Sequence, residues 1–246
     1  MTRKEGRIDE KARQYFVRED GSIPPLLSVG KGIVRSVIPE KYWAGIRNFV
    51  SGGEVRGPIE LEFGGCRYRV TTSAERYRLE HLVGEVGYLR EIINSLRRGD
   101  VYFDVGAAIG THSLSVKQAR GDEVEVVAFE PDPEAYKRLC ENVALNGMDI
   151  SVHGIALGDK DGQMELGTAG LAGLCPSFRP SWRGPRHEVN VYSLDALMRD
   201  GVLSSPDVMK IDVEGAEAMV FRGMRGLLAA SMLREVFIEI HSAYLP

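Results

Sequence analysis

The sequence predicts an α/β protein with a doubly wound, mostly parallel sheet. From Val101 onward, strand-like runs alternate with helical segments, which is the order of a parallel sheet covered by helices on both faces. The runs are rich in β-branched and apolar residues, as strands buried on both faces are. A glycine-rich turn also follows the first run. Because ligands of such sheets bind beyond the carboxyl ends of the strands, the residues at those ends are the candidate site residues.

The first 73 residues are predicted to form an N-terminal extension of the sheet domain, which spans residues 74–246. Residues 1–22 are dense in charge and are typical of a solvated helix or a frayed tail. Over residues 58–72, apolar and polar residues alternate on both sides of Gly64 and Gly65. This pattern predicts a β-hairpin, because glycine favours the positive φ angles of a two-residue turn.

Helical spacing is clearest in two segments. Apolar residues recur at helical intervals over residues 74–99, with Gly84 and Gly87 as expected breaks and Gly99 as the expected cap. A later helix begins after Asp132, which is a favoured N-cap residue followed by proline. The two segments flank the first two predicted strands.

Five segments are predicted to be strands of the sheet. Each is short and apolar or β-branched, and a helical segment or a turn signal separates it from the next. In chain order they are VYFDVG at 101–106, VEVVAFE at 124–130, ISVHGIALG at 150–158, VMKIDV at 208–213 and EVFIEIH at 235–241.

Composition argues against several classes of function. Lys and Arg number 31 against 35 Asp and Glu, which gives a net charge of -4. The chain therefore lacks the overall positive charge that is typical of proteins that bind nucleic acid or anionic lipid. The three cysteines lack the spacing of a zinc site or a disulfide framework. No segment approaches the roughly 18 apolar residues needed to span a bilayer. We therefore expect a cytoplasmic protein that does not insert into membranes.

The turn after the first predicted strand indicates a nucleoside cofactor. Gly106, Ala107 and Gly110 belong to a G-x-x-x-G turn, whereas dinucleotide sites have G-x-G-x-x-G. Alanine in place of the middle glycine would crowd a pyrophosphate. Glu130 ends the second strand and is placed to accept hydrogen bonds from ribose hydroxyls, while Asp104 suits a cationic group such as an ammonium. Together these residues point to S-adenosylmethionine (SAM).

Several segments, taken in order, resemble the FkbM family of SAM-dependent methyltransferases. They include VYFDVGAAIGTHSL, AFEPDPEAYKRLCENVALNG and KIDVEGAEAMVFRGM, and the resemblance covers about residues 85–241. It implies the Rossmann-like class I methyltransferase fold and O-methylation of a hydroxyl on a sugar or small metabolite. By the same resemblance, Asp104, Gly106, Gly110 and Glu130 are cofactor residues, and Asp159 is the acid near the adenine.

The resemblance also implies two further strands after the fifth, which the sequence does not supply. Only SAYLP follows His241, so we expect either that the chain is truncated or that the sheet lacks its last two strands and the edge of its fifth strand is covered by something else. A bare strand edge favours association. The hairpin of residues 58–72 or a second copy of the chain is therefore expected to cover it.

Charged residues near the ends of the fourth and fifth strands predict the acceptor side of the site. Alternation places Lys210, Asp212 and Glu214 on one face of the fourth strand. If the fourth and fifth strands are neighbours, Glu239 and His241 of the fifth strand lie close to Asp212 and Glu214 of the fourth. Asp212, Glu214 or His241 would then take the proton of the acceptor. Two alternatives stay open: a buried ion-pair network around Lys210, and a divalent metal site, although the spacing matches no metal motif.

The segment SFRPSWRGPRHE, residues 177–188, combines arginines with aromatic residues. It is predicted to be either a surface loop or a lid over the acceptor. In the lid, Trp182 would stack on a sugar face, and Arg183 would contact anionic groups.

The favoured function is a SAM-dependent O-methyltransferase acting on a small hydroxylated or glycosidic acceptor. An RNA methyltransferase would bind SAM through the same residues, but the net negative charge of the chain argues against RNA as the acceptor. A non-catalytic SAM-binding protein is the third alternative. Methyl-transfer assays on hydroxylated acceptors and on structured RNA would separate the first two.

Overall fold

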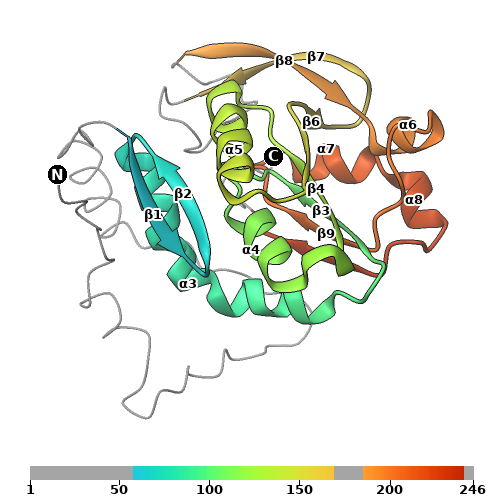
Figure 1. Cartoon of the computed structure of the whole chain (residues 1–246). Helices are drawn as coiled ribbons and strands as arrows, with labels where there is room; N and C mark the ends of the chain where they lie inside the picture. The colour runs from blue at the N-terminus through green and yellow to red at the C-terminus, as the bar shows by residue number, and fades with distance from the viewer. Residues whose placement is uncertain (1–57, 169–184, 241–246) are drawn as a thin grey trace, which may run out of the picture.

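The computed structural model describes residues 58–168 and 185–240 (Figure 1). Five parallel strands form the central sheet in the order β10-β9-β3-β4-β5, which confirms the predicted α/β fold with a parallel sheet. The strands are β3 (Val101–Val105), β4 (Glu125–Phe129), β5 (Ser151–His153), β9 (Val208–Ile211) and β10 (Glu235–Ile238).

The order of the strands creates a switch point between β3 and β9. From β3 the chain proceeds through β4 to β5 on one side, and then returns to place β9 and β10 on the other side. The loops that leave β3 and β9 therefore diverge from a common edge of the sheet. This is where doubly wound sheets bind their ligands.

Helices cover both faces of the sheet (Figure 1). One layer contains α3 (Ser73–Ser95), α4 (Thr111–Arg120) and α5 (Pro133–Asn146), and the other contains α6 (Leu194–Arg199), α7 (Glu217–Arg222) and α8 (Arg225–Ala229). Alternation along β3 sends Tyr102 into the core with the first layer and Phe103 into the core with the second. No helix in the described part of the chain is both long and apolar enough to cross a bilayer.

The predicted hairpin consists of β1 (Ile59–Phe63) and β2 (Cys66–Val70). Gly64 and Gly65 form its turn with φ angles of 59° and 80°. The inner face of β2 belongs to the same hydrophobic core as α3, α4 and the sheet. Asn142 and Asn146 of α5 accept hydrogen bonds from backbone N–H groups of β2, at 2.8 Å each. The hairpin therefore packs on α5. The prediction that the hairpin covers the edge of β10 is wrong, and a second copy of the chain stays the other predicted cover.

Helix α3 runs without interruption through Gly84 and Gly87, so the predicted breaks at these glycines are wrong. Each glycine costs a helix only about 1 kcal/mol relative to alanine, which packing against α4 and the sheet outweighs. A capping box fixes the start of the helix, since Thr72 accepts from the Glu75 N–H and Glu75 accepts from the Thr72 N–H. The helix ends at Ser95, before the predicted cap at Gly99, whose N–H donates instead to Glu123.

A second, smaller sheet lies beside the first. It contains β6 (Ala156–Leu157), β8 (Arg186–Tyr192) and β7 (Gly162–Gly167), in that order. The single strand predicted over residues 150–158 is therefore divided between the two sheets. After β5 the chain leaves the central sheet, and β6 pairs in parallel with the end of β8.

Candidate active site

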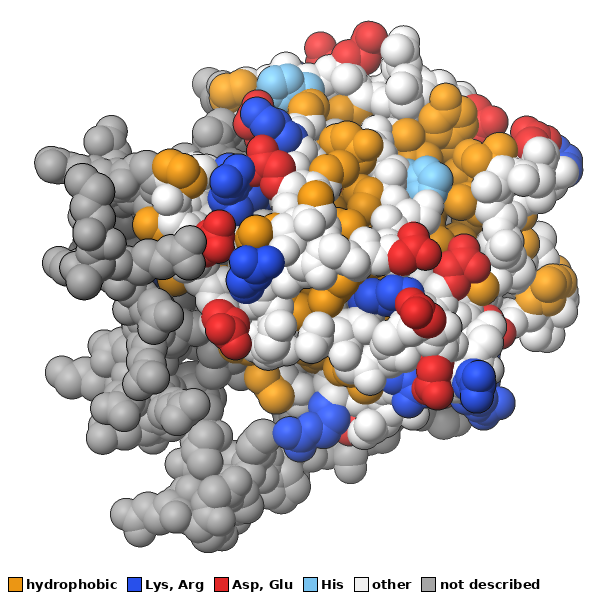
Figure 2. Space-filling model, viewed as in Figure 1, with side chains coloured by type: hydrophobic (Ala, Val, Ile, Leu, Met, Phe, Trp, Pro, Cys, Tyr) orange, Lys and Arg blue, Asp and Glu red, His pale blue; other side chains and the backbone are white. Residues whose placement is uncertain are grey.

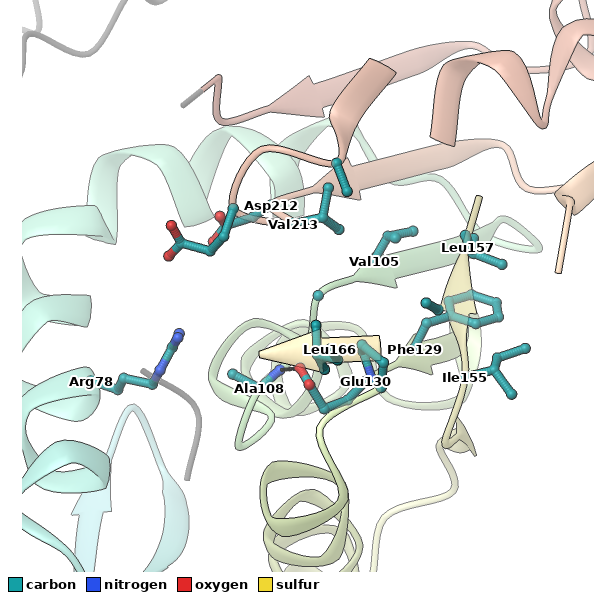
Figure 3. Close-up of a pocket in the computed structure, with 15 residues that line it drawn as sticks. Arg78, Val105, Ala108, Phe129, Glu130, Ile155, Leu157, Leu166, Asp212 and Val213 are labelled. Atoms are coloured by element: carbon teal, nitrogen blue, oxygen red, sulfur yellow. Dashed lines mark hydrogen bonds between the residues drawn. The ribbon is translucent and has the colours of Figure 1, made fainter. Parts of the chain in front are cut away.

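A cleft lies at the carboxyl ends of β3, β4 and β9, at the switch point of the sheet (Figure 3). It contains about 600 Å³ of space, part of which is open to solvent. The residues that line it are Arg78, Val105, Gly106, Ala108, Phe129, Glu130, Pro131, Ile155, Ala156, Leu157, Leu166, Asp212, Val213, Glu214 and Ala216.

The cleft has an apolar end and a charged end. Figure 3 shows Phe129, Ile155 and Leu157 at one end, and Arg78 and Asp212 at the other, with Glu130 between them. Among these residues the sequence reasoning had identified only Glu130 and Asp212. Part of the apolar lining, Ala156, Leu157 and Leu166, comes from β6 and β7. It was missed because the place of these strands next to the first sheet depends on the tertiary fold.

Glu130 follows β4 directly and connects it to the loop after β3. One carboxylate oxygen accepts from the Ala108 N–H at 2.7 Å, and the other accepts from the Asp132 N–H at 2.9 Å. Burial raises the pKa of Glu130 to about 7, although these two hydrogen bonds and the charge of Arg78 oppose the shift. Glu130 thus lines the cleft, and its contact with a ribose stays a prediction.

The loop between β3 and α4 is held in a conformation that requires glycine. Gly106 has a φ of +81°, and a Cβ there would lie 1.9 Å from the Asp212 carbonyl oxygen. The glycine therefore allows the loops after β3 and β9 to touch, while it also lines the cleft. Gly110 has a φ of +91° and is packed against Leu114 and Leu139. Neither Gly110 nor Ala107 is among the lining residues, so both shape the loop from outside the cleft.

Asp104 is occupied by partners within the protein. It is fully buried and forms a 3.0 Å ion pair with Lys210, its cross-strand neighbour on β9, and a 2.5 Å hydrogen bond with the Ser113 hydroxyl. Burial alone would raise the pKa of Asp104, but the charges of Lys210 and His112 and the hydrogen bonds from Ser113 and Lys210 together lower that pKa below its usual value. Asp104 is not among the residues that line the cleft, and its contact with the cofactor stays a prediction.

Asp212 and Glu214 both line the charged end of the cleft. Strand β9 ends at Ile211, so the alternation expected through Glu214 stops early and a turn follows. Glu214 has a φ of +50° in this turn, and Ala108 on the opposite loop has a φ of +52°. Non-glycine residues in this conformation are uncommon and concentrate at functional sites. Two of the three found in the described part of the chain line this cleft.

The remaining predicted residues do not gather at the cleft. Strands β9 and β10 are neighbours, as predicted, but Glu239 lies outside the lining and its charge acts on Tyr88, together with that of Asp212. Asp159 is also outside the lining and pairs with Arg222 at 3.5 Å. His241, Trp182 and Arg183 lie outside the described residues. Within the described ranges, no three His, Cys, Asp or Glu side chains form a group suited to a metal ion.

Comparison with known protein families gives a match over more than half of the chain. The model of the FkbM methyltransferase domain matches residues 104–244. The chain belongs to the FkbM methyltransferase family. The matched region begins within β3 and contains the end of every other strand of the central sheet. The predicted enzyme class, a SAM-dependent methyltransferase, and its Rossmann-like fold are both confirmed.

Two curated relatives of this FkbM methyltransferase cover most of its length. Hexuronic acid methyltransferase AglP from Haloferax volcanii is 29% identical over 216 residues, which are 87% of this chain and 85% of AglP. The 31-O-demethyl-FK506 methyltransferase FkbM from Streptomyces tacrolimicus is 24% identical over 213 residues, 74% of this chain and 81% of that protein.

Among solved structures, the FkbM methyltransferase of Methylobacillus flagellatus KT is 21% identical, with a TM-score of 0.39. The similarity covers 62% of this chain and 39% of that protein.

Proposed function

We propose that this protein transfers the methyl group of SAM to a hydroxyl of a sugar or other small acceptor. The order of surfaces in the cleft carries the proposal: an apolar wall, then Glu130, then a charged end. The adenine, ribose and amino-acid parts of SAM follow one another in the same order. Glu130 keeps acceptor capacity for ribose hydroxyls, because a carboxylate has about four lone-pair sites and the backbone uses two of them.

The charge of the cleft also suits SAM. Three carboxylates and one guanidinium line it, whereas SAM carries a net positive charge from its sulfonium and ammonium groups. Loss of the methyl group removes the sulfonium charge. The cleft should therefore hold SAM more strongly than the demethylated product, S-adenosylhomocysteine.

Asp212 is the residue best placed to accept the acceptor's proton. It lines the cleft with its side chain 22% exposed, so a hydroxyl group can reach it. Lys210 lies 3.7 Å from its carboxylate, and a carboxylate within hydrogen-bond reach of a hydroxyl can act as a general base. When bound, SAM supplies an electrophilic methyl carbon on its sulfonium. The protein then contributes mainly by aligning the acceptor oxygen with that carbon, and Glu214 or His241 remains an alternative base.

A small acceptor is favoured over RNA by the surface and by the relatives. Figure 2 shows acidic and basic side chains mixed on the face it displays, and no basic stripe crosses the described residues of that face. RNA-binding surfaces usually carry such a stripe. AglP is named for a hexuronic acid and FkbM for 31-O-demethyl-FK506. Trp182, Arg183 and Glu239 remain the proposed acceptor contacts.

The test is calorimetric titration with SAM, S-adenosylhomocysteine and NAD. We expect SAM to bind and NAD to give no response. Glu130→Ala should weaken SAM binding by about 10- to 100-fold, because hydrogen bonds to a charged group contribute about 1.5–3 kcal/mol.

Two further variants control this measurement. Glu130→Gln keeps an oxygen to accept from the Ala108 N–H, and so separates loss of the charge from collapse of the loop. Glu134→Ala removes the same charge from an exposed position four residues along the chain and should bind SAM as the native protein does. The assignment of this cleft to SAM would be overturned if the folded native protein does not bind SAM. It would also be overturned if Glu130→Ala and Glu134→Ala lose the same affinity for SAM.

A further inference from the structure

Arg78 is the cation among the residues that line the cleft, and it has no assigned role. It projects from α3 toward the charged end, as Figure 3 shows. Its Nε atom is buried without a hydrogen-bond partner. Its guanidinium makes no hydrogen bond or ion pair with another described residue, and Glu130 feels its charge only at longer range.

Two other arginines near α3 form ion pairs with carboxylates of the protein, although the Nε atom of Arg234 is likewise buried without a hydrogen-bond partner. Arg138 on α5 pairs with Glu75 and Glu141, and Arg234 pairs with Asp100. Their guanidinium groups join elements of the fold. A guanidinium with a buried and unpartnered donor is costly unless something else satisfies it. The contrast indicates that the guanidinium of Arg78 is available to a ligand in the cleft, since no described residue forms an ion pair with it.

The position of Arg78 indicates the chemistry of that partner. A guanidinium presents a planar fork of donors that matches a carboxylate with two parallel hydrogen bonds. If an adenine lies on the apolar wall and a ribose at Glu130, the amino-acid end of the ligand extends toward Arg78. An acceptor that enters beside Asp212 would also pass this guanidinium.

We propose that Arg78 binds a carboxylate of a ligand in this cleft. The proposal rests on the proposed function and deepens it. Two ligands can supply the carboxylate: SAM, through its amino-acid group, or an acidic acceptor such as a uronic acid. In the first case Arg78 fixes the cofactor, and in the second it selects anionic sugars as substrates.

The first experiment measures dissociation constants for SAM and decarboxylated SAM by calorimetry, in the native protein and in Arg78→Gln. If Arg78 holds the carboxylate of SAM, the variant should lose about 10- to 100-fold in SAM affinity and almost nothing for the decarboxylated analogue. Arg78→Lys should lie between the two. Arg90→Gln removes the same charge from an exposed position on α3 and should change neither value.

The second experiment titrates D-glucuronate and D-glucose into the same proteins, with and without S-adenosylhomocysteine. If Arg78 recognises the acceptor, Arg78→Gln should lose glucuronate binding and keep the native affinity for SAM. The proposal is overturned if Arg78→Gln binds both SAM and glucuronate as the native protein does, or if no ligand responds to the substitution. If the native protein binds glucuronate through Arg78 but does not bind SAM, the proposed function is overturned while the proposal for Arg78 stands.

Discussion

Two acids end neighbouring strands of the same sheet and have opposite surroundings. Asp104 on β3 and Glu130 after β4 are both buried, and both were expected to meet the cofactor. Lys210 neutralises Asp104 and lowers its pKa despite burial. Glu130 has only backbone N–H partners within hydrogen-bond distance, and burial raises its pKa to about 7. Of these two acids, Glu130 lines the cleft, whereas Asp104 is paired with Lys210 in the core.

The largest effect should come from separating Asp104 from its counterion. Lys210→Met leaves a fully buried carboxylate without a cation and should lower the free energy of unfolding by about 3–5 kcal/mol. Denaturant unfolding measures this value. The double variant Asp104→Asn with Lys210→Met should recover much of the loss, because no charge then stays buried. If the two substitutions change the free energy of unfolding by strictly additive amounts, the ion pair between Asp104 and Lys210 is contradicted.

A smaller effect should appear as a pH dependence of stability that Glu130 controls. Its pKa is about 7 in the folded protein against 4.5 as its usual value, so the folded state keeps a proton that the unfolded chain releases. The free energy of unfolding should therefore fall as the pH rises from about 4.5 to 7, by on the order of 3 kcal/mol.

Glu130→Gln should remove this slope, because glutamine does not titrate. Unfolding in urea at pH 5 and at pH 7.5 tests it, with Glu134→Ala as the matched control that keeps the slope. If the slope persists in Glu130→Gln, another group is responsible and the contrast between the two acids fails.

The smallest effect should come from Asp159, the third acid expected at the cofactor. It pairs with Arg222 at a partly exposed position outside the cleft, and such pairs contribute about 0–1 kcal/mol. Asp159→Asn should therefore change the free energy of unfolding by less than about 1 kcal/mol and leave the affinity for SAM unchanged. A loss of about tenfold or more in that affinity would show that Asp159 reaches the adenine after all.

Local patterns were sufficient to predict much of the fold. The glycine pair of the hairpin, the Asp132 cap and the strand-end position of Glu130 follow from short-range rules, and the structure contains all three. The pairing of Asp104 with Lys210 depends on strand order and register across 106 residues, which local patterns do not give. Arg78 was missed for a related reason, because α3 carries several arginines and only the packing of the helix decides which one meets the cleft.

The central place of β3 has a consequence for how the protein is made. During synthesis β3, β4 and β5 leave the ribosome before the other two strands of the central sheet, and Lys210 follows Asp104 by 106 residues. At about 5–20 residues per second this is a delay of roughly 5–20 s. Until β9 has been synthesised, one edge of β3 lacks its neighbouring strand and Asp104 lacks the lysine that pairs with it. Strand β9 then supplies both, and the residues that follow it complete the lining of the cleft.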